Sequence, residues 1–140
     1  MIYETVAAVD LGSNSFRLQV GRVVDDQIYT LDSMKEPVRL ASGLMSDKRL
    51  DAASQARALD ALRRFGERLG GLDKGAVRAV ATNTLRVAKN VHEFLPLAEE
   101  ALGFPIEVIA GREEARLIYI GASHSMPSAA HKRLIVDIGG

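Results

Sequence analysis

The sequence predicts an α/β fold in which a mixed sheet opens with an antiparallel three-strand meander and carries helices packed on it. Up to Met34 the chain alternates apolar and polar side chains, which is typical of half-buried strands. From Asp51 onward, apolar spacing typical of amphipathic helices is separated by short apolar runs. Because a helix between two strands usually crosses over to a parallel neighbour, we expect the later strands to be parallel.

Composition and charge narrow the class of protein. A chain of 140 residues can form one domain with a real core, and a hydrophobic content of 47% is too high for disorder. Eighteen basic residues balance eighteen acidic ones, so net charge offers no long-range attraction to nucleic acid or an anionic membrane. The absence of cysteine excludes disulfides and thiolate metal sites. We expect a soluble, cytoplasmic protein with no membrane span and no nucleic-acid partner.

The rest of the chain is organised around its first hairpin, residues 6–20. An apolar strand reaches Asp10, turns through Gly12–Ser15 and returns as an alternating strand. This bend suits a phosphate, because glycine lets the backbone approach and successive N–H groups can donate to one anion beside the serine and asparagine side chains. Asp10 would repel a bare phosphate but could hold a metal ion or a water beside it. The alternative is an ordinary tight turn with a capping aspartate.

A second turn and a third strand follow the hairpin. Asp25-Asp26 forms the turn, and residues 27–34 alternate again, which completes the meander. Residues 36–44 are expected to be irregular. Arg39 in that segment either reaches a bound anion or lies in solvent.

An amphipathic helix is expected to begin at Asp51, a good N-cap, and to end before Gly70-Gly71. Apolar residues three or four positions apart form one stripe along it, and charged residues lie between them. The charged cluster is either a solvated face or a contact between subunits. The stripe contains Leu59, Leu62, Phe65 and Leu69, and the cluster contains Arg63, Arg64, Glu67 and Arg68.

The remaining elements alternate strand and helix. Residues 76–81 form a short strand that leads into a helix ending at about Leu102, and residues 106–110 form a strand followed by a helix to about Ser123. Residues 125–130 are a connection. The last stretch, residues 134–140, is an apolar strand that ends in Asp-Ile-Gly-Gly and so repeats the Asp-Leu-Gly of the first hairpin.

A second candidate phosphate site lies where the strand at 76–81 enters its helix. The string Thr82-Asn83-Thr84-Leu85-Arg86 places unpaired N–H groups and the positive end of the helix dipole at one spot. Thr82 and Thr84 add hydroxyl donors, and the planar guanidinium of Arg86 suits two phosphate oxygens. The alternative is that threonine or asparagine caps the helix and Arg86 points to water.

The third string is Ile109-Ala110-Gly111-Arg112-Glu113-Glu114-Ala115, at the start of the next helix. Considered alone, a glutamate in a first helical turn needs no function, because the helix dipole favours it there.

These three strings resemble motifs of the exopolyphosphatase and guanosine pentaphosphatase (Ppx/GppA) family. Asp10–Leu18 has every letter of the pattern D-L-G-S-N-S-x-R-L, and Thr82–Arg86 fits T-x-x-x-R. Ile109–Ala115 fits I-S-G-x-E-E-A except that Ala110 replaces the serine. The resemblance runs from about residue 7 to residue 140. It implies a ribonuclease-H-like domain of the actin, sugar kinase and Hsp70 superfamily, in which two such domains hold phosphate between them.

The resemblance also implies roles for individual residues. Glu114 would be the catalytic general base that activates water, whereas Glu113 would interact with the helix dipole or with solvent. Mg²⁺ is the expected cofactor, with Asp10 and Asp137 as its ligands. The phosphate-binding residues would be Gly12, Ser13, Asn14, Ser15, Thr82, Thr84, Arg86 and Gly139.

We interpret residues 1–124 as the first domain and 125–140 as a connection and the first strand of a truncated second domain. The full-length protein would be a homodimeric exopolyphosphatase that releases orthophosphate from inorganic polyphosphate. A pppGpp 5′-phosphohydrolase, a non-catalytic sensor of polyphosphate or an alarmone, and an ATP-binding kinase or chaperone of the superfamily are the alternatives. The 140-residue chain alone, with half of its phosphate clamp absent, is expected to be inactive.

Overall fold

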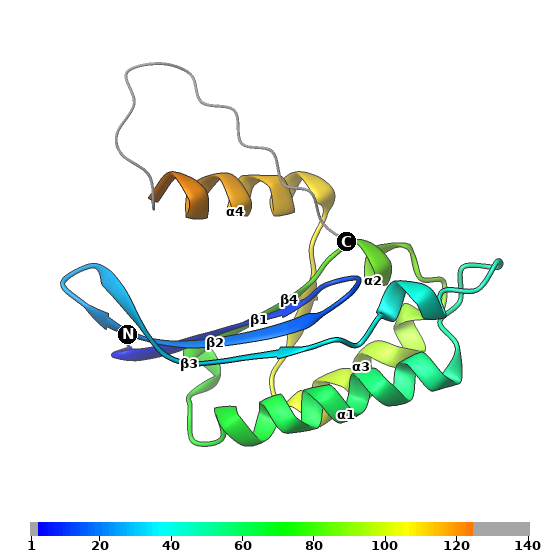
Figure 1. The fold of residues 1–140 in the computed structure, drawn as a ribbon, viewed down its shortest axis with the longest axis horizontal. Coiled ribbons are helices and arrows are strands. Elements are labelled where there is room, and N and C mark those ends of the chain that lie inside the picture. The colour runs from blue at the N-terminus through cyan, green and yellow to red at the C-terminus, as the bar shows by residue number, and fades with distance from the viewer. Residues whose placement is uncertain (1–2, 125–140) are drawn as a thin grey trace, which may run out of the picture.

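The computed structural model describes residues 3–124 of the chain, which form one five-stranded sheet with helices on both faces (Figure 1). The strands are β1 (Thr5–Leu11), β2 (Phe16–Val24), β3 (Gln27–Glu36), β4 (Val77–Ala81) and β5 (Ile106–Val108). The helices are α1 (Ala52–Leu69), α2 (Asn83–Val87), α3 (Val91–Leu102) and α4 (Gly111–His124), with short 3-10 helices at Leu40–Gly43 and Lys74–Ala76.

The sheet has the strand order β3-β2-β1-β4-β5. β1 pairs antiparallel with β2, and β2 antiparallel with β3, whereas β1, β4 and β5 run parallel to one another. The predicted mixed sheet with an opening meander is therefore confirmed, and so is the fold class that the resemblance implies. Because β1 and β4 are parallel neighbours, the loops after Leu11 and after Ala81 leave the sheet at the same edge.

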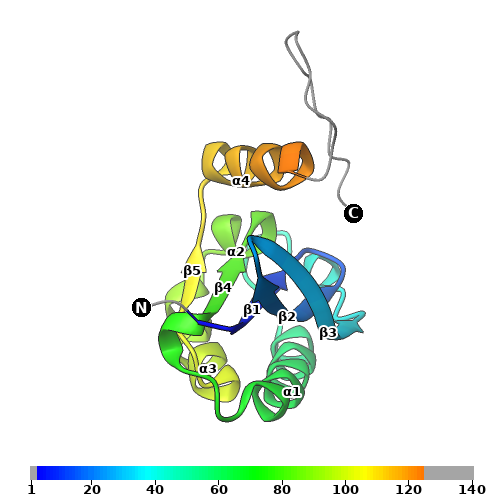
Figure 2. The ribbon, with the colours of Figure 1, turned by 90° about the vertical axis from the view of Figure 1, so that its left-hand side faces the viewer.

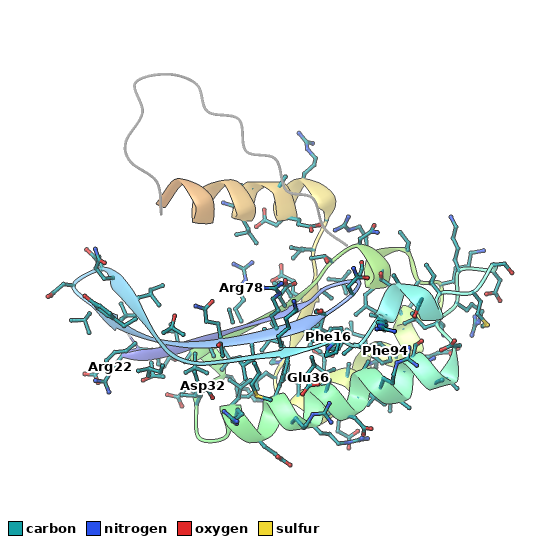
Figure 3. All side chains as sticks on the ribbon, in the orientation of Figure 1. Phe16, Arg22, Asp32, Glu36, Arg78 and Phe94 are labelled. Atoms are coloured by element: carbon teal, nitrogen blue, oxygen red, sulfur yellow. The ribbon has the colours of Figure 1, made fainter. Side chains whose placement is uncertain are left out.

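The core lies between the sheet and the two helices α1 and α3, whereas α4 stands over the opposite face (Figure 2). Inward-facing residues alternate along the strands, as in the buried Val9 and Leu11 of β1. Phe16 and Phe94, both fully buried, lie between the sheet and the helices, while Arg78 lies on the face toward α4 (Figure 3). Truncating either phenylalanine to alanine would cost about 3–5 kcal/mol.

Helix α1 begins and ends as the sequence predicts. Asp51 is its N-cap, accepting a 2.7 Å hydrogen bond from the backbone N–H of Ser54, and Gly70 follows its last residue. Within the described part of the chain, the charged cluster on α1 does more than face solvent. Arg64 pairs with Glu36 and Arg68 with Asp32, so two arginines attach the helix to the outer strand β3.

The continuous helix expected from Thr82 to Leu102 is wrong, because the chain breaks between α2 and α3. Ala88 has an extended backbone conformation, with φ −66° and ψ 124°. The buried side-chain amide of Asn90 bonds both backbone groups of Leu50: it accepts from the N–H at 2.9 Å and donates to the carbonyl at 3.1 Å. This long-range contact holds the connection in place, and α2 is left with only five residues.

Several expectations lie outside the described residues. They are the connection at 125–130, the strand at 134–140 with Asp137 and Gly139, and the boundary between two domains. Within residues 3–124, no helix is both long enough and apolar enough to cross a membrane.

Candidate functional site

The tip of the first hairpin, residues 12–15, is hydrogen-bonded to the segment that contains Arg39 and Ala41. The tip closes on itself through a 3.2 Å hydrogen bond from the Gly12 N–H to the Ser15 carbonyl. The N–H of Ala41 donates to the carbonyl of Ser13 at 2.9 Å, and the N–H of Arg39 donates to the next carbonyl, that of Asn14, at 2.7 Å. The tip is thus fixed partly by hydrogen bonds from residues that lie more than 20 positions away in the sequence.

The start of α2 meets this tip directly. The Thr84 hydroxyl donates a 2.8 Å hydrogen bond to the Ser13 hydroxyl oxygen, across 71 positions of sequence. Thr84 is buried, with 3% of its surface exposed. Since Ser13 accepts in this bond, its own hydroxyl hydrogen remains available for a ligand. The first two of the predicted phosphate loops therefore lie side by side.

Unused backbone donors gather at this junction. In the part of the chain that the structure describes, the N–H groups of Ser13, Asn14 and Ser15 have no hydrogen-bond acceptor. The first N–H groups of α2, at Asn83 and Thr84, have no partner inside the helix, as at any helix start. A Cβ at Gly12 would lie 2.8 Å from the Ser15 carbonyl oxygen, so a larger residue would force the tip open. The junction therefore offers donors, which is what an anion needs.

Arg86 joins α2 to the start of α4. Its Nε donates to the carbonyl oxygen of Ile109 at 2.9 Å, and its Nη2 donates to Oε2 of Glu114 at 2.7 Å. Both side chains of the ion pair are 30% exposed. A Cβ at Gly111 would lie 3.3 Å from Nη1, so the glycine leaves room for the guanidinium. Arg86 therefore does not simply point to water, and its contacts place Glu114 beside α2.

The two adjacent glutamates of α4 have different surroundings. Glu113 accepts two hydrogen bonds from Arg116, from Nε at 2.8 Å and from Nη2 at 2.6 Å. These hydrogen bonds hold the pKa of Glu113 below its usual value, and the positive charges of Arg116 and Arg78 act in the same direction. Glu114 uses one oxygen for Arg86, and its other oxygen makes no hydrogen bond or ion pair within the described residues. Both carboxylate oxygens of Glu113 are therefore hydrogen-bonded, whereas Glu114 keeps one oxygen without a hydrogen bond among the described residues.

Asp10 is an exposed residue next to the last position of β1, two residues before Gly12. Among the described residues no group of three or more side chains could hold a metal ion by itself. Mg²⁺ is often bound by one or two carboxylates together with phosphate oxygens and waters, so a carboxylate beside a predicted phosphate loop fits that ion. The second expected ligand, Asp137, lies outside the described residues.

The structure thus brings together most of the residues that the sequence singles out. Thr82 sits at the N-cap of α2, but its side chain makes no capping bond. Gly139, like Asp137, cannot be placed. Sequence reasoning missed the backbone of Arg39 and Ala41 and the carbonyl of Ile109, because main-chain contacts leave no pattern in side-chain types. The residues that do converge are Asp10, Gly12, Ser13, Asn14, Ser15, Thr82, Thr84, Arg86 and Glu114.

Solved structures of similar proteins share this fold. One is a Ppx/GppA enzyme from Aquifex aeolicus, with 28% identity and a TM-score of 0.81 over 89% of this chain and 42% of that one. Another is an exopolyphosphatase from Cytophaga hutchinsonii, with 29% identity and a TM-score of 0.77 over 86% and 38%. A third is an exopolyphosphatase-like protein, with 35% identity and a TM-score of 0.74 over 81% and 34%.

This chain therefore spans about a third to two fifths of the length of these three proteins. A family model, that of the Ppx/GppA phosphatase family, matches residues 19–140. The matched region contains the loop at Thr82–Arg86 and the start of α4, and it begins just after the first hairpin tip. The chain belongs to the Ppx/GppA phosphatase family.

Proposed function

We propose that the full-length protein is an exopolyphosphatase, which hydrolyses the terminal phosphoanhydride of inorganic polyphosphate and releases orthophosphate. The observation that carries the proposal is the pair of contacts that unites three separated loops: Thr84 with Ser13 and Arg86 with Glu114. Family membership supports phosphatase chemistry. Two of the similar structures are of proteins named exopolyphosphatase or exopolyphosphatase-like, which favours polyphosphate as the substrate.

The hairpin tip and the start of α2 would hold the terminal phosphate. The amides of residues 13–15, the hydroxyl of Ser13 and the first amides of α2 are donors without an acceptor in the described structure. The Nη1 atom of Arg86 adds a charged donor, because only Nε and Nη2 are engaged. Donors fixed before the ligand arrives need little reorganisation when charge develops on the phosphate.

Glu114 would act as the general base. In the proposed step the water oxygen attacks the terminal phosphorus as its proton moves to the carboxylate of Glu114. The bond from phosphorus to the bridging oxygen breaks, and that oxygen leaves with the electron pair on the shortened polyphosphate. Arg86 fixes one carboxylate oxygen of Glu114, which leaves the other oxygen to orient the water.

Mg²⁺ would be held at Asp10 and Asp137. When bound there, the ion would neutralise part of the negative charge of the phosphates. Asp10 supplies the hard oxygen donor that this ion prefers, next to the loop that would bind the phosphate.

Hydrolysis of pppGpp is the second candidate. The described residues of the site are aspartate, glycine, serine, asparagine, threonine, arginine and glutamate, and none of them offers an aromatic surface for a base. These residues recognise phosphate alone, so they fit the terminal phosphate of either substrate.

Side-by-side assays with the full-length protein separate the candidates. We expect orthophosphate release from long polyphosphate with a kcat/KM at least about tenfold above that for pppGpp, a difference of some 1.4 kcal/mol in transition-state binding. The reverse ratio would assign the protein to pppGpp. Polyphosphate binding without any release would indicate a sensor, and ATP binding with no release from either substrate would indicate a kinase or chaperone.

A further inference from the structure

A short segment behind the first hairpin tip, residues 38–43, is called the brace here. Two amides of the brace, those of Arg39 and Ala41, bond the carbonyls of Asn14 and Ser13. In a regular antiparallel ladder, amides two positions apart reach carbonyls two positions apart. Here they reach carbonyls that are adjacent in sequence, so the brace must curl sharply between them.

Arg39 provides that curl. Its backbone has φ 54° and ψ 50°, the left-handed region that arginine rarely adopts. The backbone N–H and the hydroxyl of Ser42 both bond the Arg39 carbonyl, at 3.2 and 2.7 Å. The Arg39 side chain is exposed and makes no ion pair with any described residue. The hydrogen bonds of Arg39 are therefore made by its backbone.

The brace is itself fixed on the core and on α1. Its residues Val38 and Leu40 are buried, with 3% and 0% of their surfaces exposed. Arg57 of α1 donates through Nε to the Val38 carbonyl at 3.1 Å, and the N–H of Asp51 donates to the Gly43 carbonyl at 2.9 Å. A segment held at both ends in this way can impose its geometry on the hairpin tip.

The two bonds from the brace determine where the tip amides point. No peptide bond in the described chain is cis, and in a trans peptide the C=O and N–H point in opposite directions. The carbonyl of Ser13 shares its peptide with the N–H of Asn14, and the carbonyl of Asn14 shares its peptide with the N–H of Ser15. Because both carbonyls face the brace, both amides face away from it, and neither has an acceptor in the described residues.

We propose that Arg39 is a positioning residue whose left-handed backbone, rather than its charge, turns the amides of Asn14 and Ser15 toward a bound phosphate. The identity of that anion rests on the function proposed above. Arg39 does not touch the reacting atoms, and its effect passes through the two tip carbonyls.

Four variants of the full-length protein test the proposal, with inorganic pyrophosphate as the probe in titration calorimetry. Arg39→Val and the milder Arg39→Ala disfavour a positive φ, whereas Arg39→Gly removes the charge but permits it. Lys48→Val imposes the same strain at another left-handed residue, with φ 63°, in the loop that contacts Lys89. Thermal unfolding identifies variants that fail to fold.

We expect Arg39→Val to weaken pyrophosphate binding about tenfold or more, since misaligned donors lose hydrogen bonds to a charged group. Arg39→Ala should weaken it less, while Arg39→Gly should restore affinity to within about twofold, because glycine adopts this conformation without strain. Lys48→Val should leave affinity within about twofold, because the strain lies away from the tip.

Equal loss in Arg39→Gly and Arg39→Val would show that the side chain acts, and unchanged affinity in Arg39→Val and Arg39→Ala would show that the backbone does not position the tip. Either result overturns the proposal, as would the absence of pyrophosphate binding by the unaltered protein. Pyrophosphate binding with the expected variant pattern but no phosphate release from polyphosphate or pppGpp would refute the proposed function alone.

Discussion

The two hairpin tips at opposite ends of β2 are built differently (Figure 1). The tip between β2 and β3 is the pair Asp25-Asp26, with φ values of 50° and 62°. Positive φ at both central residues is the geometry of a type I′ turn, which matches the twist of the strands. Within the described chain, neither aspartate is hydrogen-bonded to another element. We call this pair the free tip.

The tip at residues 12–15, here called the anchored tip, contains no residue with positive φ. Its shape depends on contacts with Arg39, Ala41 and Thr84. A free tip satisfies only the requirements of its own strands. An anchored tip is fixed by other segments, and such prior ordering is what a binding site requires. The difference supports the proposal that the anchored tip, and not the free tip, binds the ligand.

The largest expected effect is at the anchored end of the sheet, from Glu114→Gln in the full-length protein. Loss of a general base should lower kcat for phosphate release by about 10²–10⁴-fold. Glu113→Gln is the matched control, one residue away, and should change kcat by no more than about twofold, because it removes only an exposed ion pair with Arg116. Similar losses in both variants would remove Glu114 from its proposed role.

A smaller effect is expected when Thr84→Val removes the link between the two loops that are proposed to bind phosphate. The change keeps the shape of a buried side chain but removes its hydrogen bond to Ser13, so stability should fall by about 1 kcal/mol. We expect kcat/KM to fall about tenfold as the loops lose alignment.

Thr30→Val is the control for this link, because Thr30 accepts an exposed hydrogen bond from Gln19 in the meander. Denaturant unfolding and phosphate release should both stay near those of the unaltered protein. Loss of activity in Thr30→Val, or full activity in Thr84→Val, would contradict the distinction between the two tips.

Glycine substitutions should change the stability of the protein in opposite directions at the two tips. Asp26→Gly removes the strain of a positive φ and should raise stability by about 0.5 kcal/mol. Asn14→Gly relieves no such strain, and its added unfolded-state entropy should lower stability by about 0.5–1 kcal/mol. Thermal unfolding measures both stability changes. If both variants were stabilised, or both destabilised, the two tips would not differ in backbone strain.

The last prediction concerns the stability of the fold and how it depends on pH, in the variant Asp51→Ala at the start of α1. Hydrogen bonds from Ser54 lower the pKa of Asp51 in the folded protein from 3.8. A lowered pKa stabilises the fold at pH values above the unfolded pKa, and this stabilisation is lost as pH falls through the folded value. The variant should therefore be less stable than the unaltered protein at neutral pH, and the difference should shrink below pH 3.8. A difference that grows on acidification would contradict this.

Sequence patterns predicted both turns, the meander and the convergence of the loops, because strand alternation and parallel crossovers fix which strand ends share an edge. They could not predict the brace, which acts through the amides of Arg39 and Ala41, nor the break before α3. That break is accompanied by the contact between Asn90 and Leu50, 40 positions apart, which local propensity does not encode.

Backbone amide NMR of the full-length Glu114→Gln protein, titrated with tripolyphosphate, tests whether the anchored tip and α2 build one phosphate site. This variant should bind the ligand without consuming it. We expect the amides of residues 13–15 and of Asn83 and Thr84 to shift together, with one affinity, while those of Asp25 and Asp26 stay unchanged. Shifts at only one of the two loops, or equal shifts at the free tip, would contradict a single phosphate site built by the anchored tip and α2.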